Sequence, residues 1–433
     1  MKVHIKTLGC KVNYVESEAL AQVMKSYGFE IVDDEVCDIF VLNSCTVTND
    51  SDKKSRQALT RNRKINPENY SVIMGCYSQV ASEELKLKDY VNYIVGNKNK
   101  IEVVSDIINN LNLSDNNKII SVEDIAKYKV FDNIHIDYTT TKTRGFIKIQ
   151  DGCDHFCSYC IIPYARGRVR SRSVKDIKEE AKRLVDNGVK EIVLTGIEVA
   201  SYGKDLENIK LIDAIESVQS VNPEVRIRLS SLEIHSINDN FIKRVKDLPG
   251  FCDHFHLSLQ SGSDPVLKAM NRRYTSEFFK ERVMIIKDNF KNIGLTTDII
   301  VGFPGETDEM FNQTVNYVQD IGFSKVHVFP YSPRRNTPAA KREQIDNQIK
   351  NERAKILRSI SDELEKKFIE KNKNVELKML VEERKNGNFI GYTTNYIRAQ
   401  LSTEEYSDIK LNTIVNIKNI GGNKEKWIVC SAK

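Results

Sequence analysis

Short apolar runs alternate with longer amphipathic segments along the first hundred residues. The runs Val3–Leu8, Asp38–Asn43 and Ser71–Met74 have the length and composition of buried strands, and the segments Val12–Tyr27 and Asp50–Lys64 have helical periodicity. Strands that alternate with helices are typical of a parallel sheet covered by helices. We therefore predict an N-terminal open parallel α/β sheet.

A polar passage from about Lys98 to Thr143 follows this sheet. It is rich in Asn and Asp and shows little periodicity. We place a domain boundary within it, so that the first domain spans residues 1–130 and a second domain begins near residue 140.

Six further strand candidates, again separated by helical segments, follow the polar passage. They are Gly145–Gln150, Glu191–Thr195, Arg226–Ser231, His254–Leu259, Thr297–Val301 and Lys325–Phe329. Because a complete barrel of this kind has eight strands, six strands predict a partial (β/α)6 barrel.

The segment from Lys341 to Lys371 completes this predicted domain, residues 140–370. Its apolar residues recur at helical spacing: Ile345, Ile349, Ile356, Ile360, Leu364 and Phe368. The pattern predicts one amphipathic helix with a charged outer face.

The last sixty-odd residues change character. Val375–Glu382 alternates, Asn386-Gly387 is a strong signal for a two-residue hairpin, and Gly421-Gly422 precedes the strand candidate Trp427–Cys430. We predict a small all-β barrel over residues 371–433.

The composition is that of a folded cytosolic protein. Apolar residues make up 40% of the 433 residues, no run of about 18 apolar residues occurs, and the first residues lack the apolar core of a signal peptide. We expect a cytoplasmic protein without a membrane span. The net charge of +5 is too small to indicate nucleic-acid binding by itself, but the segment from Tyr331 to Lys433 holds 21 Lys and Arg against 14 Asp and Glu.

Nine cysteines in a cytosolic chain indicate metal binding or catalysis rather than disulfides. The most specific signal is a CxxxCxxC run after the first barrel strand, formed by Cys153, Cys157 and Cys160, hereafter the cluster-loop cysteines. Three thiolates can hold three corners of an iron–sulfur cube and leave the fourth iron open to a substrate. A zinc site with His155 as the fourth ligand is the alternative.

A second cysteine triplet is distributed along the N-terminal domain. Cys10, Cys45 and Cys76, hereafter the strand-end cysteines, each follow a predicted strand. Because the carboxyl ends of parallel strands line a common crevice, we expect these side chains to converge into a second three-thiolate site. The alternative is that they are three buried cysteines of the core.

The other cysteines and the barrel-strand histidines are interpreted as residues of the core. They are Cys37, Cys252 and Cys430, with His254, His256 and His327.

The CxxxCxxC run resembles the signature of the radical S-adenosylmethionine superfamily. The similarity to the methylthiotransferase family of this superfamily extends over essentially the whole chain. It is carried by Gly152–Pro163, Arg166-Gly167, Arg170–Arg172, Leu257–Gly262, Met270–Thr275 and Gly302–Thr307.

This resemblance implies two [4Fe–4S] clusters. The cluster-loop cysteines would hold the one that binds S-adenosylmethionine and yields a 5′-deoxyadenosyl radical, and the strand-end cysteines would hold an auxiliary cluster that delivers sulfur. Two S-adenosylmethionine molecules are consumed per turnover, and the usual acceptor is carbon 2 of a modified adenosine at tRNA position 37. The implied partners are the tRNA anticodon stem-loop, an external electron donor of flavodoxin or ferredoxin type, and proteins that supply sulfur and iron–sulfur clusters. The C-terminal barrel is implied to be an RNA-binding TRAM module.

In this superfamily, groups at the strand ends hold the cofactor. The residues at such places here are Thr195, Gly196, Glu198, Ser231, Glu233, Gln260 and Arg272. Glu233 could equally be a structural carboxylate that pairs with Arg226 or Arg228.

Two further sets of residues are candidates for RNA binding. Arg166, Arg168, Arg170, Arg172 and Lys175 form a run without an acidic residue, which would neutralise phosphates or simply form a solvated charged face. Phe389, Tyr392, Tyr396 and Trp427 in the last module would stack on bases, although we expect most of them to be core residues.

Within the family, Gly9–Asn13 (GCKVN) resembles the branch that acts on threonylcarbamoyladenosine, whereas the isopentenyladenosine branch typically has GCQMN. The segment Tyr331–Pro338 departs from the family form because Asn336 replaces a glycine, although Asn tolerates positive φ. The alternatives are the same chemistry on isopentenyladenosine in tRNA or on an aspartate of a ribosomal protein. A further alternative is a non-catalytic iron–sulfur or zinc RNA-binding protein.

Overall fold

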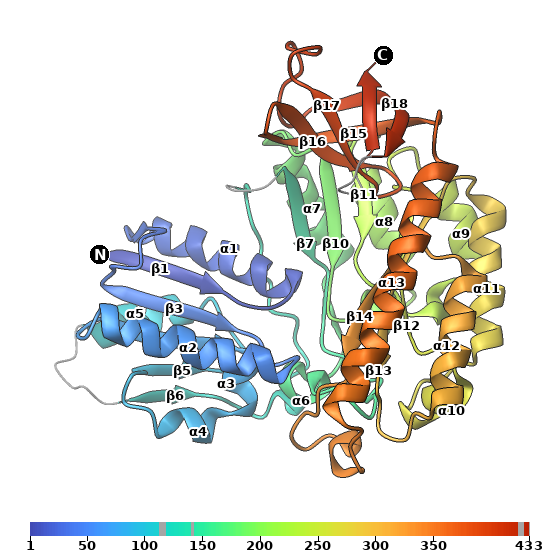
Figure 1. Ribbon diagram of the computed structural model, residues 1–433. Helices are drawn as coiled ribbons and strands as arrows, with labels where there is room; N and C mark the ends of the chain where they lie inside the picture. The colour runs from blue at the N-terminus through green and yellow to red at the C-terminus, as the bar shows by residue number, and fades with distance from the viewer. Residues whose placement is uncertain (112–117, 140–142, 423–427, 433) are drawn as a thin grey trace.

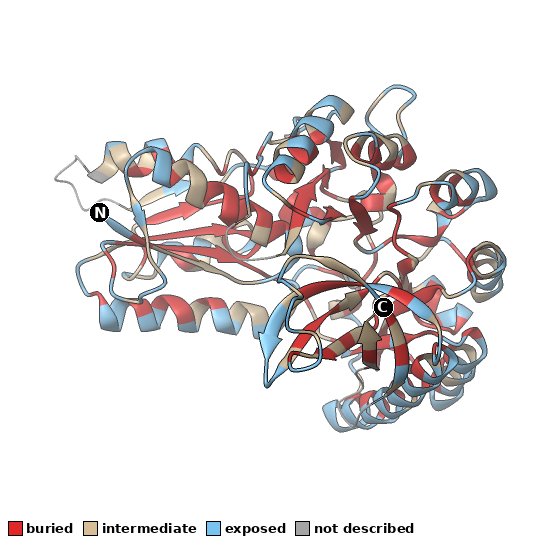
Figure 2. Ribbon diagram, turned by 90° about the horizontal axis from the view of Figure 1, so that it is seen from above, coloured by how far each residue is buried: buried red, intermediate tan, exposed pale blue. Residues whose placement is uncertain are grey.

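The computed structural model describes residues 1–111, 118–139, 143–422 and 428–432. Figure 1 shows an N-terminal sheet with its helices, a curved middle part built of strands and helices, and a small C-terminal barrel. Seen from above in Figure 2, the strands are mainly buried and the helices turn exposed faces outward. Among the described residues, no helix is long and apolar enough to cross a membrane.

The N-terminal sheet has six strands, and every neighbouring pair is parallel, in the order β2-β1-β3-β4-β5-β6. The strands are β1 (Lys2–Thr7), β2 (Glu30–Ile31), β3 (Ile39–Ser44), β4 (Tyr70–Gly75), β5 (Tyr93–Val95) and β6 (Ile119–Ser121). The helices are α1 (Lys11–Ser26), α2 (Asn49–Ile65), α3 (Cys76–Val80), α4 (Ser82–Lys86) and α5 (Val103–Leu111). The predicted open parallel sheet is confirmed.

The polar passage after Lys98 contains more structure than its composition indicates. Both α5 and β6 lie within it, and β6 adds a sixth strand to the sheet. The helix is fixed by Val103, Val104 and Ile107, which pack into the core of the sheet. The prediction failed here because β6 has three residues, too few to show a strand period.

The middle part contains two sheets of three parallel strands, β7-β10-β11 and β12-β13-β14. A parallel bridge between Leu232 and Leu257 joins them. The strands are β7 (Arg144–Lys148), β10 (Glu191–Thr195), β11 (Arg226–Leu229), β12 (His254–Gln260), β13 (Gly294–Val301) and β14 (Lys325–Pro330). All six strands were predicted, in sequential order, as expected for a partial barrel.

Helices cover the outer face of this partial barrel. They are α7 (Val174–Asp186), α8 (Leu211–Gln219), α9 (Asp239–Lys246), α10 (Asp264–Ala269), α11 (Ser276–Asn289), α12 (Asp308–Ile321) and α13 (Asn347–Lys371). The short elements are η1 (Ile125–Lys127), η2 (Val199–Ser201), η3 (Ile234–Ser236), η4 (Pro338–Lys341), α6 (Ile162–Arg166) and the antiparallel pair β8 (Gln150–Asp151) and β9 (Arg170–Ser171).

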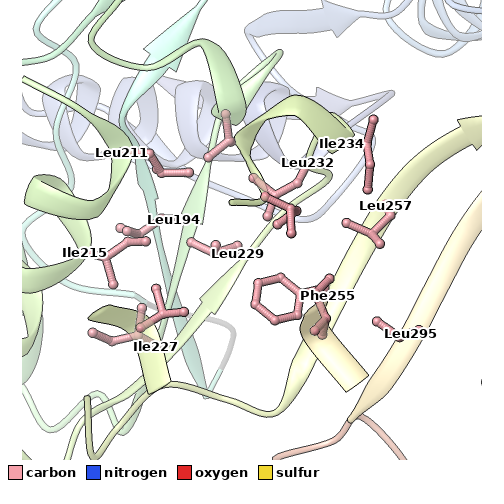
Figure 3. Close-up of a cluster of buried hydrophobic side chains, with 14 of the residues drawn as sticks. Leu194, Leu211, Ile215, Ile227, Leu229, Leu232, Ile234, Phe255, Leu257 and Leu295 are labelled. Carbon is pink, nitrogen blue, oxygen red and sulfur yellow. The ribbon is translucent and has the colours of Figure 1, made fainter. Parts of the chain in front are cut away.

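Alternation along the barrel strands separates an apolar outer layer from a polar interior. Figure 3 shows Leu194, Leu229 and Leu257 from three strands pointing into one cluster with Leu211 and Ile215 of α8. The alternate positions on these strands carry polar side chains, which include Glu191, Arg226, Arg228, His254 and His256. The interior of the barrel is therefore rich in hydrogen bonds and ion pairs, beside a small apolar cluster of Phe146 and Val193 with Val15.

Helix α13 forms as predicted, but its buried face is rotated relative to the predicted apolar stripe. Ile349 and Ile356 are exposed, whereas Ala354, Leu357 and Leu364 are buried. The difference arises because buried polar contacts fix the helix near its start: Arg353 donates to Glu306 over 2.8 Å.

The C-terminal part is a closed barrel with the strand order β15-β16-β17-β19-β18. Its strands are β15 (Glu376–Lys385), β16 (Asn388–Thr393), β17 (Arg398–Ser402), β18 (Ile414–Gly422) and β19 (Ile428–Ala432). Asn386 and Gly387 both have positive φ, 49° and 71°, as the predicted two-residue hairpin requires. Phe389 lies in the barrel core, and Trp427 lies outside the described residues.

This small barrel covers the amino-terminal ends of the partial-barrel strands. Arg226 at the start of β11 donates to the Thr393 carbonyl over 3.1 Å, and the Tyr396 ring stacks on His254 with centroids 4.6 Å apart. Tyr392 stacks on Tyr396 in turn, at 4.9 Å. Both tyrosines therefore pack between the two barrels, in line with the expectation that most of these aromatic residues have a structural role.

Glu191 is the anion at the centre of this junction. It is fully buried and pairs with Arg226 at 2.7 Å, Arg228 at 3.0 Å and Arg144 at 3.1 Å. Although burial opposes the shift, these guanidinium groups lower the pKa of Glu191. Its contribution to stability is therefore present at neutral pH and is lost as the pH falls below the ordinary glutamate range.

Replacing Glu191 by Gln should lower the free energy of unfolding by about 3 kcal/mol, because three buried guanidinium groups lose their anion. Scanning calorimetry at pH 7 measures the loss as a lower transition temperature. Glu370→Gln is the matched control, since Glu370 pairs with Lys373 on the surface and should cost less than about 0.5 kcal/mol. A drop no larger than that of the control would contradict the role of Glu191.

Candidate active site

The strand-end cysteines come from three neighbouring strands of the N-terminal sheet. Cys45 directly follows β3, Cys76 begins α3 directly after β4, and Cys10 precedes α1 beyond β1. Burial, together with the charges of Cys76 and Cys10, raises the pKa of Cys45 to about 11. The three thiols are therefore close enough to interact, as the strand pattern predicts.

Two glycines permit this close approach. Gly9 and Gly75 precede Cys10 and Cys76 with φ of 110° and 104°, which L side chains rarely adopt. A Cβ on Gly9 would lie 2.8 Å from Cβ of Cys45, and a Cβ on Gly75 would lie 2.6 Å from the Ser44 carbonyl oxygen. The three turns can converge only because both positions lack a side chain.

Asn13 ties these turns together, and sequence reasoning missed it. Its side chain donates to the carbonyls of Leu8 over 3.1 Å and of Ser44 over 2.9 Å. Its Oδ1 accepts from Cys10 Sγ at 3.4 Å. The available signal was the spacing Gly-Cys-x-x-Asn, which places an amide one helical turn after the first cysteine.

The cluster-loop cysteines lie beyond the carboxyl end of β7, on the loop between β8 and α6. The Cys153 N–H donates to the Gly167 carbonyl over 3.0 Å, and the Cys160 N–H donates to the Cys157 carbonyl over 3.0 Å. Burial, together with the charge of Cys157, raises the pKa of Cys160 to about 12. This triplet also forms one group of interacting thiols.

Arg272 reaches this triplet from the chain after α10. It donates to Cys157 Sγ over 3.5 Å, to the Ser258 carbonyl over 3.0 Å and to the Tyr274 hydroxyl over 3.0 Å. Arg272 and Glu233 are 3.8 Å apart. Glu233 accepts from the His235 ring at 2.9 Å, whereas Arg226 and Arg228 pair with Glu191, so Glu233 is not their structural partner.

The remaining predicted cofactor residues lie at the strand ends as expected. Thr195 ends β10, and Gln260 ends β12 with a φ of 71°. Burial raises the pKa of Glu198 to about 7, against the opposing charge of Arg272. Burial and then the charge of Glu198 raise the pKa of Cys153. Gly196 packs against the Gln150 side chain, which its Cβ would meet at 2.8 Å. Ser231 is exposed beyond β11.

An arginine side chain contacts one sulfur of each triplet. Among the described residues, no three His, Cys, Asp or Glu side chains are arranged to hold one metal ion. A zinc ion would hold its sulfur ligands at about 2.3 Å, so this finding does not favour the zinc alternative. Each triplet instead receives a guanidinium N–H at a sulfur: Arg272 at Cys157, and Arg166 Nε at Cys76 over 3.1 Å. Such donors match the negative charge of a thiolate-bound cluster.

A cavity of ≈ 250 Å³ lies between the cluster loop and the turn after Cys45. Cys160 and Gln260 line it on one side, and Val47 and Thr48 on the other. Its walls are mainly apolar and include Tyr159, Ile161, Ile162, Ile300, Phe329 and Tyr331. The polar residues Asp298 and Ser332 complete the lining.

Arg334 fixes the two sides of this cavity to each other. It follows β14 of the partial barrel and donates to Asn49, Thr46 and Asp52 of the N-terminal part, at 2.5, 2.7 and 2.5 Å. The turn that carries it includes Asn336, whose φ of 65° shows that this asparagine adopts the positive φ that glycine favours.

The predicted basic surface after the cluster loop is wrong for three of its arginines. Arg166, Arg170 and Arg172 are buried, at 0%, 1% and 2% exposure. Arg172 pairs with the buried Glu180, and Arg170 donates to the carbonyls of Arg166 and Arg168. These side chains are held by buried partners and cannot reach phosphates, whereas Arg168 and Lys175 are exposed.

The other interpretations of isolated residues are mostly confirmed. Cys37, Cys252 and Cys430 are buried. His254 and His256 share the Thr296 hydroxyl inside the partial barrel, at 3.0 and 2.8 Å. His327 is exposed, which corrects its assignment to the interior.

Comparison with known families gives two matches. Residues 147–318 match the radical SAM superfamily, which implies a [4Fe–4S] cluster and S-adenosylmethionine as cofactors. Residues 2–96 match a family described as the uncharacterized protein family UPF0004.

Solved structures agree on the fold. The radical S-adenosylmethionine methyltransferase TsrM from Kitasatospora setae, with tryptophan and a cofactor analogue bound, superposes with a TM-score of 0.57 at 16% identity. The similarity covers 78% of this chain and 75% of that one.

Two relatives are similar over nearly the whole chain. The threonylcarbamoyladenosine tRNA methylthiotransferase MtaB of Bacillus subtilis is 40% identical over 92% of this chain and 89% of its own length. A tRNA-2-methylthio-N(6)-dimethylallyladenosine synthase of Hydrogenobaculum is 34% identical, with 94% of each chain covered. The chain therefore belongs to the methylthiotransferase family of radical S-adenosylmethionine enzymes.

Proposed function

We propose that the protein adds a methylthio group to carbon 2 of threonylcarbamoyladenosine at tRNA position 37. The observation that carries this proposal is the cavity between the two cysteine triplets, with Cys160 on one wall and the turn after Cys45 on the other. An acceptor in this cavity would lie beside both the source of the radical and the source of sulfur. The GCKVN segment and the 40% identity to the Bacillus subtilis enzyme support threonylcarbamoyladenosine as the modified base.

The proposed cofactors are two [4Fe–4S] clusters, with the cluster-loop cysteines and the strand-end cysteines as their ligands, and two S-adenosylmethionine molecules per turnover. When bound, these groups supply the 5′-deoxyadenosyl radical and the methylated sulfur.

The chain's own residues orient and shield these groups. Arg272 donates to Cys157 and is itself held by Tyr274, so it fixes the cluster loop. We assign Thr195, Gly196, Glu198, Glu233 and Gln260 to the cofactor side of the cavity, with Ser231 at its outer edge. Apolar walls from Ile161, Ile300 and Phe329 exclude water from the reacting face of the base.

We further propose three functional domains: residues 1–130 for the auxiliary cluster, 140–370 for the radical chemistry, and 371–433 as a TRAM module that binds RNA. The exposed Lys378, Arg384, Lys385 and Lys410 support the last assignment. Because this module covers the strand ends opposite the cysteines, an RNA that contacts both must extend along the strands, over about 20 Å for a strand of six residues.

The proposed partners are the tRNA anticodon stem-loop, an electron donor of flavodoxin or ferredoxin type, and proteins that supply sulfur and iron–sulfur clusters, all in the cytoplasm. Isopentenyladenosine is the second candidate base, since relatives with 34% to 36% identity carry that specificity in their names.

Mutations in the two cysteine triplets should abolish different steps of the reaction. Cys157→Ala should abolish formation of 5′-deoxyadenosine, because the open-iron cluster loses a ligand. Cys45→Ala should block sulfur insertion while it spares some cleavage of S-adenosylmethionine. Chromatography of anaerobic reactions measures both products, and the iron content should fall from about eight to about four per chain in each variant. Equal loss of 5′-deoxyadenosine in both variants would contradict the division of roles.

Deletion of the gene should remove the methylthio derivative of threonylcarbamoyladenosine from bulk tRNA and leave unmethylthiolated threonylcarbamoyladenosine in its place. Nucleoside digestion with mass spectrometry makes the measurement, and the methylthio isopentenyl derivative serves as the internal control. If that control disappears instead, the second candidate base is correct.

Phe329 should stack on the target base or its neighbour, since its ring lines the cavity and is 48% exposed. Phe329→Ala should raise KM for the anticodon stem-loop about tenfold, because stacking on an aromatic ring contributes about 1–3 kcal/mol per base. Tyr27→Ala removes an aromatic ring that is 61% exposed on the surface and should leave KM unchanged. The same KM in both variants would contradict the proposed stacking of Phe329 on a base.

A further inference from the structure

Arg166 joins the two cysteine triplets. Its side chain donates to Cys76 Sγ over 3.1 Å and to Asn13 Oδ1 over 2.8 Å, and Asn13 holds the turns of Cys10 and Cys45. Its neighbour Gly167 accepts from the Cys153 N–H at 3.0 Å. A single short segment therefore contacts the strand-end cysteines through a side chain and the cluster loop through the backbone.

Buried ion pairs hold this segment in place. Arg166 Nη1 donates to Glu16 of α1 over 2.5 Å, and Glu16 also accepts from Lys148 of β7 at 2.9 Å. Lys148 donates in turn to Asp151 over 2.6 Å. The network connects the N-terminal part to the partial barrel, and it contacts the strand-end cysteines through Arg166.

Glu16 does not require Arg166 for its charge. Lys100 and Lys148 both pair with it, and Asp151 has Lys148 and Arg170 as neighbours. The network thus contains four buried cations, Lys100, Lys148, Arg166 and Arg170, against the two carboxylates. Buried positive charge is costly without a negative counter-charge, so the two unmatched cations would be stabilised by a further anion. A thiolate at Cys76, whose sulfur contacts Arg166, would supply that negative charge.

The planar guanidinium group suits this place because it donates in several fixed directions at once. Nε faces Cys76, Nη2 faces Asn13 and Nη1 faces Glu16. A lysine could supply the charge and three donors, but all three lie on one nitrogen and cannot reproduce the spacing of the three guanidinium nitrogens.

We propose that Arg166 is a positioning residue of the sulfur-delivering site: it holds the strand-end cluster at a fixed place relative to the cluster loop, and its bond to Cys76 favours the reduced state of that cluster. The inference rests on the proposed function, because it requires a cluster on the strand-end cysteines. A hydrogen bond to a ligand sulfur stabilises the additional negative charge of the reduced cluster and so raises its reduction potential.

The test isolates the strand-end cluster in the triple variant Cys153→Ala/Cys157→Ala/Cys160→Ala, which should retain about four iron per chain. Arg166→Gln and Arg166→Lys are introduced into this background, and the reduction potential is measured by a titration followed by electron paramagnetic resonance. Arg61→Gln is the matched control, since Arg61 pairs with Glu35 on the surface of the same N-terminal part. Circular dichroism and the iron content verify the fold of each protein.

Arg166→Gln is expected to shift the potential to a more negative value, Arg166→Lys to shift it less, and Arg61→Gln to leave it unchanged. In the chain with all nine cysteines, Arg166→Gln should lower the yield of methylthiolated product at least tenfold while 5′-deoxyadenosine still forms. If Arg166→Gln does not fold, the reduction potential of Arg166→Lys, compared with that of the Arg61→Gln control, tests the proposal.

Folded variants at Arg166 with the potential of the Arg61 control would overturn the proposal. The potential is measured without RNA, so it does not depend on which base is modified. A triple variant that holds no iron would instead contradict the proposed auxiliary cluster itself, and the two failures are therefore distinguishable.

Discussion

The structure depends on a buried ion network between two parts of the chain that are distant in sequence. Glu16 on α1 meets Lys148 on β7 and Arg166 after the cluster loop, and all three side chains are excluded from solvent. Removing one partner from such a network typically costs about 3–5 kcal/mol, so the arrangement resists sliding of the N-terminal sheet against the partial barrel. That rigidity matters because the two cysteine triplets lie on opposite sides of this junction.

A second network at the other end of the partial barrel has a different role. There Glu191 gathers three arginines, and two of them donate to carbonyls of the C-terminal barrel. The polar interior of the partial barrel is therefore closed by ion pairs at its amino-terminal end and opens toward the cysteines at its carboxyl end. The two cysteine triplets and the C-terminal barrel therefore lie at opposite ends of the partial-barrel strands.

The order of the strands and the two cysteine triplets could be predicted because each leaves a local pattern. Apolar runs mark the barrel strands, and each strand-end cysteine follows such a run. The partners of buried charges could not be predicted, because Glu16 and Arg166 are 150 positions apart and neither has a distinctive neighbour in sequence. The bond from Arg334 to Asp52 could not be predicted either, because the two residues are far apart in sequence. Strand β6 could not be predicted because it has only three residues.

The arginine run after the cluster loop illustrates how a local pattern misleads. Alternate basic residues without acidic neighbours are typical of a phosphate-binding surface, yet here the counter-charges come from other elements: Glu16 for Arg166 and Glu180 for Arg172. Only burial distinguishes the two cases, and burial is a property of the fold. Arg168, which follows α6, and Arg335, which follows β14, are exposed, and each pairs with an acidic residue. A run of arginines in a sequence is therefore not by itself evidence of a phosphate-binding surface.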